Sequence, residues 1–225
     1  MLVAIEGIDG AGKGTLTRGL EARARAAGLR IATLSFPRYE ETCFSQLIAQ
    51  YLNGEFGGLD EVPPRFAALL YAGDRFESRD MLAGLLAGHD LVICDRYVAS
   101  NMAYQTARLP AAERAGFLAW LAATEFETFG LPRPDLTLLL ATDTATADAL
   151  VARKAARSYT EATRDLHEAA GALMSSVAAV YVELAAADPD GWQPVQALDA
   201  NGALRSPDQI ADDAWALIAA RLGSA

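Results

Sequence analysis

The sequence predicts a three-layer α/β/α domain built on a five-stranded parallel sheet. Five short apolar segments alternate along the 225 residues with longer segments of helical periodicity, which is the pattern of an α/β domain. Residues 91–94 are a continuous apolar run, typical of a strand buried on both faces of a parallel sheet. The first apolar segment breaks directly into a glycine-rich turn. We therefore expect one domain over residues 1–225, with right-handed crossovers and ligands at the carboxyl ends of the strands.

Each element follows from a local pattern. Leu16, Leu20 and Ala24 recur at helical spacing after the turn, and Ser206 to Gln209 form a capping box with Pro207 at the first helical position. Strands are expected at residues 2–6, 31–36, 91–94, 135–140 and 192–198. Helices are expected at residues 13–27, 42–52, 63–85 as one long helix, 98–104, 111–129, 142–159, 166–184 and from 207 onward.

Composition limits the possible partners. A net charge of −10 argues against binding to nucleic acid, which requires a broad basic surface. An apolar run of about 18 residues, as needed to cross a membrane, is absent from the sequence, so we expect no membrane partner and a cytoplasmic protein. Cys43 and Cys94 are too few for a disulfide framework or a metal site. Both are expected to be packing residues.

The turn after the first strand has the residues of a phosphate-binding loop. It matches G-x-x-x-x-G-K-[ST] except at the last place, where Gly14 stands and the hydroxyl follows at Thr15. Its glycines allow the backbone N–H groups to point inward, the next helix offers its N-terminus, and Lys13 supplies a positive charge. A glycine-rich turn can be only a connection, but the spacing, Lys13 and Thr15 together favour phosphate binding.

The end of the third strand carries a second signal, Asp95-Arg96-Tyr97. In many proteins with such a loop, an Asp at this strand end helps to hold Mg²⁺. Arg96 could then face phosphate oxygens. The alternative is a salt bridge between Asp95 and Arg96 at a strand end.

Together these features resemble the thymidylate kinase family, which transfers a phosphoryl group from ATP to dTMP. The resemblance spans nearly the whole chain and implies a P-loop nucleoside-monophosphate kinase fold, ATP and dTMP as substrates, Mg²⁺ as cofactor and a homodimer. The segments that carry it are 7–15, 36–39, 74–75, 95–97 with Ser100, Asn101 and Tyr104, and 164–168.

The resemblance also implies roles for the loop and the metal site. Asp9 is an unusual carboxylate beside phosphate unless it addresses a metal or orients the acceptor. The expected ATP-binding residues are Gly7, Asp9, Gly10, Ala11, Gly12, Lys13, Gly14 and Thr15. The expected metal residues are Asp9, Thr15, Asp95 and Glu168, and the expected catalytic residues are Lys13, Asp9, Arg96, Arg153 and Arg157.

For the acceptor, the resemblance implies that Arg38 and Arg96 grip its phosphate, because a planar guanidinium can bind two oxygens. It implies stacking of Tyr71 on the base, contacts of Arg75 and Asn101 with the base edge, and Tyr104 and Tyr39 beside the sugar. The tyrosines could instead be core residues, and Asn101 a helix cap. The expected set is Phe36, Arg38, Tyr39, Tyr71, Arg75, Arg96, Ser100, Asn101, Tyr104, Asp165 and His167.

A lid is expected at about residues 143–164. Arg153 and Arg157 lie one helical turn apart there. They could be only a solvated helix face. The resemblance, however, implies a transition-state arginine either in the loop or in the lid, and because Gly10 and Gly14 leave the loop without one, we expect the lid to supply it. Asp165 and Glu168 share a face near a helix start, where the helix dipole alone favours carboxylates. His167 departs from the tyrosine usual in the family.

Two rival functions stand beside this hypothesis. Another small-molecule kinase with the same loop would fit the fold, although Asp95-Arg96-Tyr97 argues against a deoxynucleoside kinase, which tends to have Glu-Arg-Ser. A nucleotide-dependent switch would leave the acceptor residues idle, and the sequence lacks the Asn/Thr-Lys-x-Asp motif for guanine.

Overall fold

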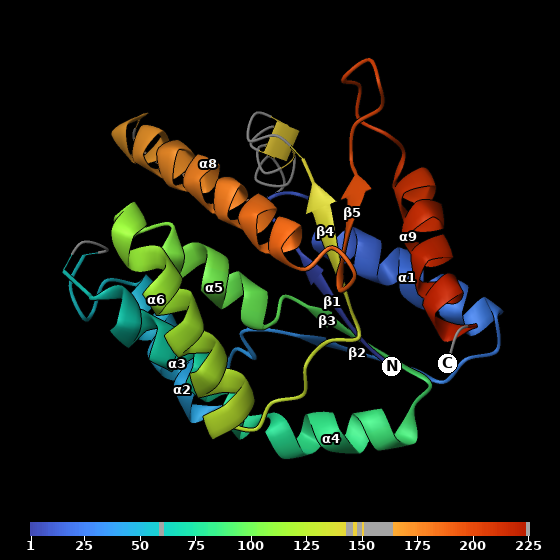
Figure 1. Ribbon diagram of the computed structural model, residues 1–225, viewed down its shortest axis with the longest axis horizontal. Helices are drawn as coiled ribbons and strands as arrows, with labels where there is room; N and C mark the ends of the chain where they lie inside the picture. Colours follow the sequence, from blue (N-terminus) through green and yellow to red (C-terminus); the bar gives the residue numbers. More distant parts are fainter. Residues whose placement is uncertain (59–60, 143–145, 148–149, 151–163, 224–225) are drawn as a thin grey trace.

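The computed structural model describes residues 1–58, 61–142, 146–147, 150 and 164–223, and these form the expected three-layer domain (Figure 1). All the strands run parallel, in the order β2-β3-β1-β4-β5. The strands are β1 (Leu2–Glu6), β2 (Ile31–Ser35), β3 (Leu91–Asp95), β4 (Leu136–Ala141) and β5 (Trp192–Gln196). Because β1 is central, the loop that follows it lies over the middle of the sheet.

Helices cover both faces of the sheet (Figure 1). On one face lie α1 (Lys13–Ala26) and α9 (Pro207–Leu222), which contact each other. On the other face lie α4 (Arg79–Gly88), α5 (Val98–Thr106) and α8 (Arg164–Ala187). Three helices, α2 (Cys43–Leu52), α3 (Pro64–Glu77) and α6 (Ala111–Ala122), pack beyond α5 through contacts of α3 and α6 with it.

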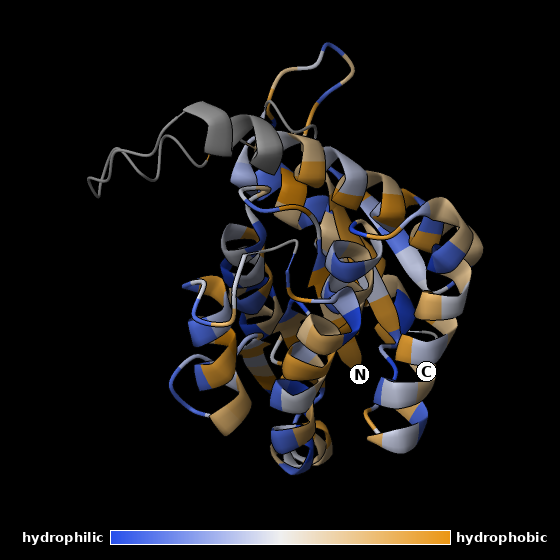
Figure 2. Cartoon of the chain, turned by 90° about the vertical axis from the view of Figure 1, so that its left-hand side faces the viewer, coloured by the Kyte–Doolittle hydropathy of each residue, from blue (hydrophilic) through white to orange (hydrophobic). Residues whose placement is uncertain are grey.

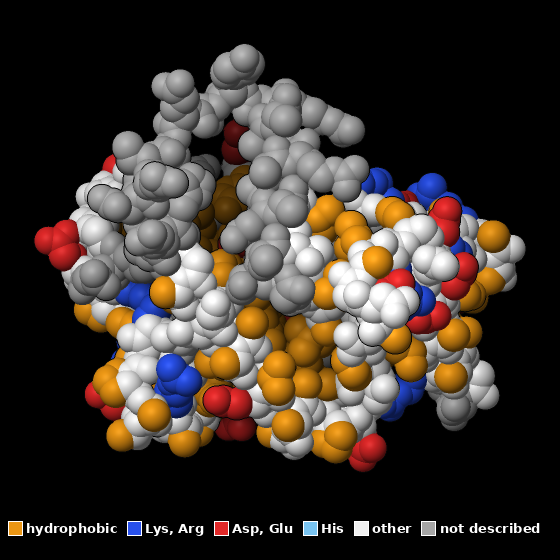
Figure 3. All heavy atoms as spheres, turned by 90° about the horizontal axis from the view of Figure 1, so that it is seen from above, with side chains coloured by type: hydrophobic (Ala, Val, Ile, Leu, Met, Phe, Trp, Pro, Cys, Tyr) orange, Lys and Arg blue, Asp and Glu red, His pale blue; other side chains and the backbone are white. Residues whose placement is uncertain are grey.

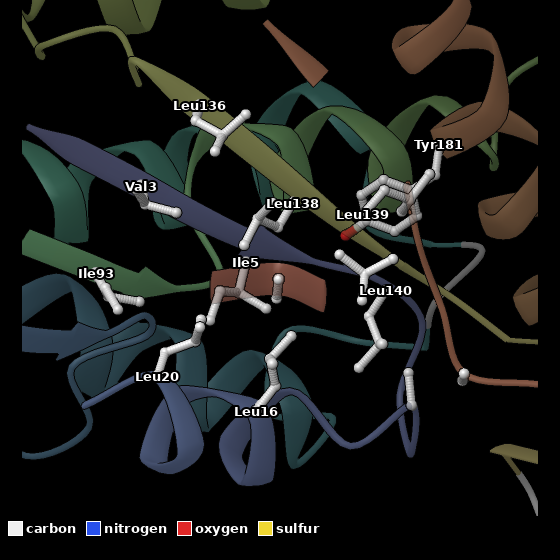
Figure 4. Close-up of a cluster of buried hydrophobic side chains, with 14 of the residues drawn as sticks. Val3, Ile5, Leu16, Leu20, Ile93, Leu136, Leu138, Leu139, Leu140 and Tyr181 are labelled. Carbon is white, nitrogen blue, oxygen red and sulfur yellow. The ribbon is translucent and has the colours of Figure 1, made fainter. Parts of the chain in front are cut away.

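The central strand is buried along its whole length, as its unbroken apolar sequence predicts. Ile5 faces Leu16 and Leu20 of α1, as Figure 4 shows. Ala4 points to the opposite face, where it packs in a cluster with Leu82 and Val98. Figure 2 shows the same division, with hydrophobic residues in the sheet and hydrophilic residues on the outer sides of the helices. Packing on both faces holds the carboxyl end of β1 rigidly in place.

The prediction of one long helix over residues 63–85 is wrong. Helix α3 ends at Glu77, and α4 begins at Arg79. Between them Ser78 is buried, and its Oγ donates to the carbonyl of Asp74 at 2.8 Å. The N–H of Ser78 also reaches the carbonyls of Asp74 and Arg75. These bonds satisfy the carbonyls at the end of α3 and allow the chain to turn.

The prediction of one regular helix over residues 111–129 is also wrong. Helix α6 ends at Ala122 and continues as a π-helical segment, η1 (Ala123–Thr128). Within this wider turn, the Glu125 carboxylate is anchored to Arg75 of α3. Thr124 Oγ1 donates back to the carbonyl of Trp120 at 2.8 Å, a local bond of the kind that disturbs regular helices.

Two further expectations have different outcomes. Cys94 is buried, and burial raises the pKa of its thiol to about 12, whereas Cys43 is exposed at the first position of α2, so its assignment as a packing residue is wrong. The capping box at Ser206 is confirmed, with both of its hydrogen bonds present. Within the described ranges, no helix is long and apolar enough to span a bilayer.

Candidate active site

The glycine-rich loop leaves β1 at Gly7 and enters α1 at Lys13. Gly7 and Gly12 have φ angles of 148° and 97°, which favour glycine. A Cβ atom on Gly7 would lie only 3.0 Å from the carbonyl oxygen of Leu140, so the loop passes close against β4. The Lys13 ammonium donates to the carbonyls of Gly7 at 3.0 Å and Ile8 at 2.8 Å. It is thereby held across the mouth of the loop.

Lys13 is in an environment that disfavours its charge. Burial lowers the pKa of the ammonium to about 8, assisted by the nearby Arg96 cation. Asp9, Asp95 and Glu6 act in the opposite direction and only partly compensate. An anion bound in the loop would therefore restore the protonated form.

Arg96 bridges the loop and the neighbouring helix α5. Its backbone has a φ of 67°, a left-handed conformation that is uncommon outside glycine and found at functional sites. The guanidinium pairs with Asp9 and donates to Ser100 Oγ at 3.2 Å and to the hydroxyl of Tyr104 at 3.4 Å. The alternative of a salt bridge between Arg96 and Asp95 is therefore wrong, because the partner of Arg96 is Asp9.

Beneath Arg96 lies a buried carboxylate that the sequence analysis missed. Glu6, the last residue of β1, accepts hydrogen bonds from the N–H of Tyr97 at 2.8 Å, from Ser100 Oγ at 2.5 Å and from the hydroxyl of Tyr181 at 2.9 Å. The signal in the sequence that could have revealed Glu6 is a carboxylate at the end of an apolar strand. Nothing local marks Tyr181, since it lies within the apolar stripe of α8.

Asp95 lies beside Gly14 at the entrance of the loop. A Cβ atom on Gly14 would be 3.5 Å from Asp95 Oδ2 and 3.8 Å from Arg18 Nη1. Arg18, which the sequence analysis did not consider, donates to Thr15 Oγ1 at 3.2 Å. Burial raises the pKa of Asp95, while Lys13, Arg96 and Arg18 oppose that shift. Arg18 of α1 therefore places a cation close to Gly14, in a loop that contains no arginine of its own.

A cavity of about 210 Å³ opens beside Arg96. It brings together most of the residues expected to bind the acceptor, which come from α3, α5 and the segments after β2 and β3. Its lining consists of Asp9, Phe36, Pro37, Tyr39, Leu52, Tyr71, Arg75, Arg96, Tyr97, Ser100, Asn101, Tyr104 and Gln105. Arg38 is outside this set: it pairs with Glu41 and donates to Ser78 Oγ at 3.1 Å.

The far end of the cavity combines aromatic and polar groups. Tyr71 packs against the cluster around Ile48, and burial raises the pKa of its hydroxyl. Asn101 lies within α5, so the alternative that it caps a helix is wrong. Arg75 is buried and paired with Glu125, a residue that the sequence analysis missed because no local pattern marks it.

The remaining predicted residues are placed only in part. Arg153 and Arg157 lie outside the described residues, as does most of the expected lid. Asp165, His167 and Glu168 lie in the first turns of α8, where the structure describes the helix but not the side chains. Among the described residues, no group of three His, Cys, Asp or Glu side chains could hold a metal by itself.

A central strand that runs into a lysine-bearing glycine loop, next to a cavity lined by arginine and aromatic residues, defines a P-loop nucleoside-monophosphate kinase. The family model described as thymidylate kinase matches residues 5–203. The chain belongs to the thymidylate kinase family.

Several curated relatives carry the same name. A thymidylate kinase of Mycobacterium tuberculosis (strain H37Rv) is 43% identical over 192 residues, covering 85% of this chain and 87% of the relative. A thymidylate kinase of Solidesulfovibrio magneticus is 30% identical over 227 residues, covering 97% and 98%. One of Bifidobacterium longum (strain DJO10A) is 30% identical over 202 residues, covering 88% and 89%.

Proposed function

We propose that this protein is an ATP-dependent dTMP kinase, which converts dTMP and ATP to dTDP and ADP for dTTP synthesis. The observation that carries the proposal is the position of Arg96. Its guanidinium contacts Asp9 and the carbonyl of Gly7 in the loop, and it also lines the cavity. One cation therefore faces both the place for a donor phosphate and the place for an acceptor phosphate.

In this proposal the loop binds the donor. The backbone N–H groups from Gly10 to Thr15 would surround the β- and γ-phosphates of ATP, and Lys13 would exchange a carbonyl partner for a phosphate oxygen. The residues present also fit Mg²⁺, which usually takes one or two carboxylates together with substrate phosphates and water. Asp95 would hold it, with Thr15 close by, and Mg²⁺ when bound neutralises charge on the transferred phosphoryl group.

The acceptor would lie in the cavity with its phosphate toward Arg96. Asp9 contacts Arg96 rather than a second carboxylate, which supports a role in orienting that cation over a role as metal ligand. Phe36 and Tyr71 offer apolar and aromatic surface to the base. Arg75 and Asn101 offer a donor and an acceptor to its edge. Arg38, which follows the lining residues Phe36 and Pro37 in the chain, is proposed as the second cation for this phosphate.

The reaction needs no general base, because the phosphate of dTMP is already ionised. One of its oxygens forms a bond to the γ-phosphorus, and the bond from that phosphorus to the β–γ bridging oxygen breaks. ADP leaves with the electron pair. The protein contributes alignment and positive charge, chiefly from Lys13 and Arg96. Arg153 and Arg157 are proposed to add charge when the lid closes and excludes water.

A coupled assay of ADP release with dTMP, dUMP, dCMP, dGMP and AMP tests the proposal. We expect turnover of dTMP, modest discrimination against dUMP, which lacks only a methyl group, and strong discrimination against the purine nucleotides. Absence of dTMP turnover in the presence of ATP and Mg²⁺ would refute the proposed function. Turnover of a purine nucleotide at a similar rate would place the protein elsewhere among these kinases.

The role of Arg96 has its own test. Arg96→Ala should lower kcat by about 10²-fold or more, because it removes a cation that acts on the transferred charge. Arg25→Ala is the matched control, since Arg25 is an exposed residue of α1 whose ion pair within the described part of the chain is with Glu21. Equal rates for the two variants would show that the acceptor phosphate does not lie at Arg96.

A homodimer and a cytoplasmic location are part of the proposal through the family alone. Nucleic acid is not proposed as a partner. On the face seen in Figure 3, Lys and Arg side chains are interspersed with Asp and Glu rather than gathered into one broad basic surface.

A further inference from the structure

A buried ion pair lies directly behind the base end of the cavity. Glu125 is fully buried and Arg75 is 2% exposed. The carboxylate accepts from Arg75 Nε at 2.5 Å and from Arg75 Nη2 at 2.6 Å, a bidentate arrangement. Burial alone lowers the pKa of Arg75, but the carboxylate of Glu125 outweighs it and raises that pKa. Because burying two charges is costly, such a pair is weak evidence for stability by itself and calls for another explanation.

The backbone around Glu125 departs from regular helix to make this pair. Glu125 lies in the π-helical segment η1, and such wide turns are frequent at functional sites. The segment is closed by hydrogen bonds from the N–H of Phe129 to the carbonyl of Thr124 at 2.9 Å and from the N–H of Leu131 to the carbonyl of Glu125 at 3.1 Å. These bonds fix the backbone at Glu125 and hold its side chain against Arg75, which lies 50 positions earlier in the chain.

Glu125 also engages Asn101, the second polar residue at the base end. Asn101 Nδ2 donates to Glu125 Oε1 at 2.9 Å and to the carbonyl of Ala68 at 2.9 Å. Both partners are acceptors, so the amide can take only the orientation with Nδ2 toward them. The atom left over is Asn101 Oδ1, which is buried without a hydrogen-bond partner in the described part of the chain.

The two side chains that Glu125 fixes both line the cavity, whereas Glu125 does not. With Nε and Nη2 of Arg75 bound to the carboxylate, Nη1 is the donor that has no hydrogen bond among the described residues. Because Arg75 and Asn101 both donate to Glu125 Oε1, a charged donor and a buried acceptor belong to the same hydrogen-bonded cluster at the cavity. A thymine edge offers the complementary pair, a 4-carbonyl and a 3-N–H, while cytosine offers an amino group and an unprotonated ring nitrogen.

We propose that Glu125 is a positioning residue for base selection, which acts through Arg75 and Asn101 to set the donor and the acceptor that face the base. This inference rests on the proposed function of the cavity. It assigns the choice between 4-oxo and 4-amino pyrimidines to a residue that does not touch the substrate. A site with buried groups built for one hydrogen-bond pattern rejects the wrong pattern strongly.

The test is a comparison of kcat/KM for dTMP and dCMP in the full-length protein and its Glu125→Gln variant. The substitution keeps the size of the side chain but removes the charge and one acceptor, so Arg75 loses its bidentate partner. We expect the preference for dTMP over dCMP to fall at least about 10-fold, mainly through a higher KM for dTMP, with the KM for ATP unchanged. Glu127→Gln is the matched control, because Glu127 is an exposed carboxylate in the same π-helical segment.

A double-mutant cycle separates positioning from a structural role. If Glu125 acts through Arg75 and Asn101, Glu125→Gln should have a smaller effect on the dTMP/dCMP preference in an Arg75→Ala background, and in an Asn101→Ala background, than in the unmodified protein. Additive effects on that preference, or a lower melting temperature with unchanged preference, would overturn the inference. If Glu125→Gln does not fold, Glu125→Asp retains the charge with a shorter reach and should still reduce the preference. An unchanged preference in Glu125→Asp would then overturn it. Failure of the proposed function is distinct, since the unmodified protein would not turn over dTMP.

Discussion

Lys13 is buried at the mouth of the glycine loop, and its ammonium donates to the carbonyl oxygens of Gly7 and Ile8. With a pKa lowered to about 8, it loses its proton as the pH rises through 8 in the ligand-free protein. Since kcat/KM reports the free enzyme, we expect kcat/KM for ATP to fall about 10-fold per pH unit above pH 8. Bound phosphates stabilise the ammonium, so kcat should decline only at higher pH. Initial rates from pH 6 to 10 measure both.

Lys13→Arg provides the comparison for this prediction, because a guanidinium keeps its charge over the whole range. Its kcat/KM for ATP should be lower at pH 7 but should lack the decline above pH 8. A decline of equal steepness in this variant would assign the titration to another group.

For single residues, a local motif could be recognised in the sequence, but the long-range hydrogen-bond partners of buried residues could not. Gly7 to Thr15 and Asp95-Arg96 carry their chemistry in local spacing. Glu125 and Tyr181 act through contacts 50 and 175 residues away, with Arg75 and Glu6. No local pattern encodes such a contact, since it exists only once the helices have packed. The exposed Cys43 was misassigned for the same reason.

Helix α3 contributes Tyr71 and Arg75 to the cavity wall, and it approaches α2 closely at Gly73. A Cβ atom at this position would lie 2.4 Å from the ring of Phe44 in α2. Gly73→Ala should therefore reduce the free energy of unfolding by about 1–3 kcal/mol, the range for overpacking a tight contact. Because Tyr71 and Arg75 flank Gly73 on α3, the KM for dTMP should rise as well. Urea unfolding and initial rates measure the two effects.

Gly84→Ala is the matched control, since Gly84 is an exposed position in α4 with nothing within 4 Å of its added Cβ atom. Alanine has the higher helix propensity, so this variant should gain roughly 0.5–1 kcal/mol in the free energy of unfolding. Destabilisation of similar size in both variants would show that the contact with Phe44 does not limit the packing.

The predicted helix boundaries were wrong where the hydrogen bonds of a polar side chain end or widen a helix that the apolar periodicity predicts to continue. The apolar stripe continues from α3 into α4, but buried Ser78 divides them through its bonds to Asp74 and Arg75. The apolar pattern of residues 111–129 likewise conceals the π-helical segment. Periodicity records which face is buried; it does not record the hydrogen bonds that end or widen a helix.

For the whole molecule, the prediction from sequence was nearly complete. Continuous apolar strands and alternating helices specify a parallel sheet, because few topologies bury both faces of every central strand. The sequence placed the glycine-rich loop after the first strand, and the structure shows that this strand is central in the sheet. The cavity itself could be predicted only as a set of residues and not as a shape, since its depth depends on how α3, α5 and η1 pack together.

The residues that line the cavity are grouped in one part of the sequence. Apart from Asp9, the side chains that line it among the described residues lie between residues 36 and 105, whereas the glycine-rich loop lies within residues 7–15. Under the proposed function, the loop that holds the donor and most of the wall that holds the acceptor are therefore encoded in separate stretches of the coding sequence, and Glu125 is encoded beyond both. Divergence at Arg75, Asn101 or Glu125 can then change the preferred base while the loop is inherited intact.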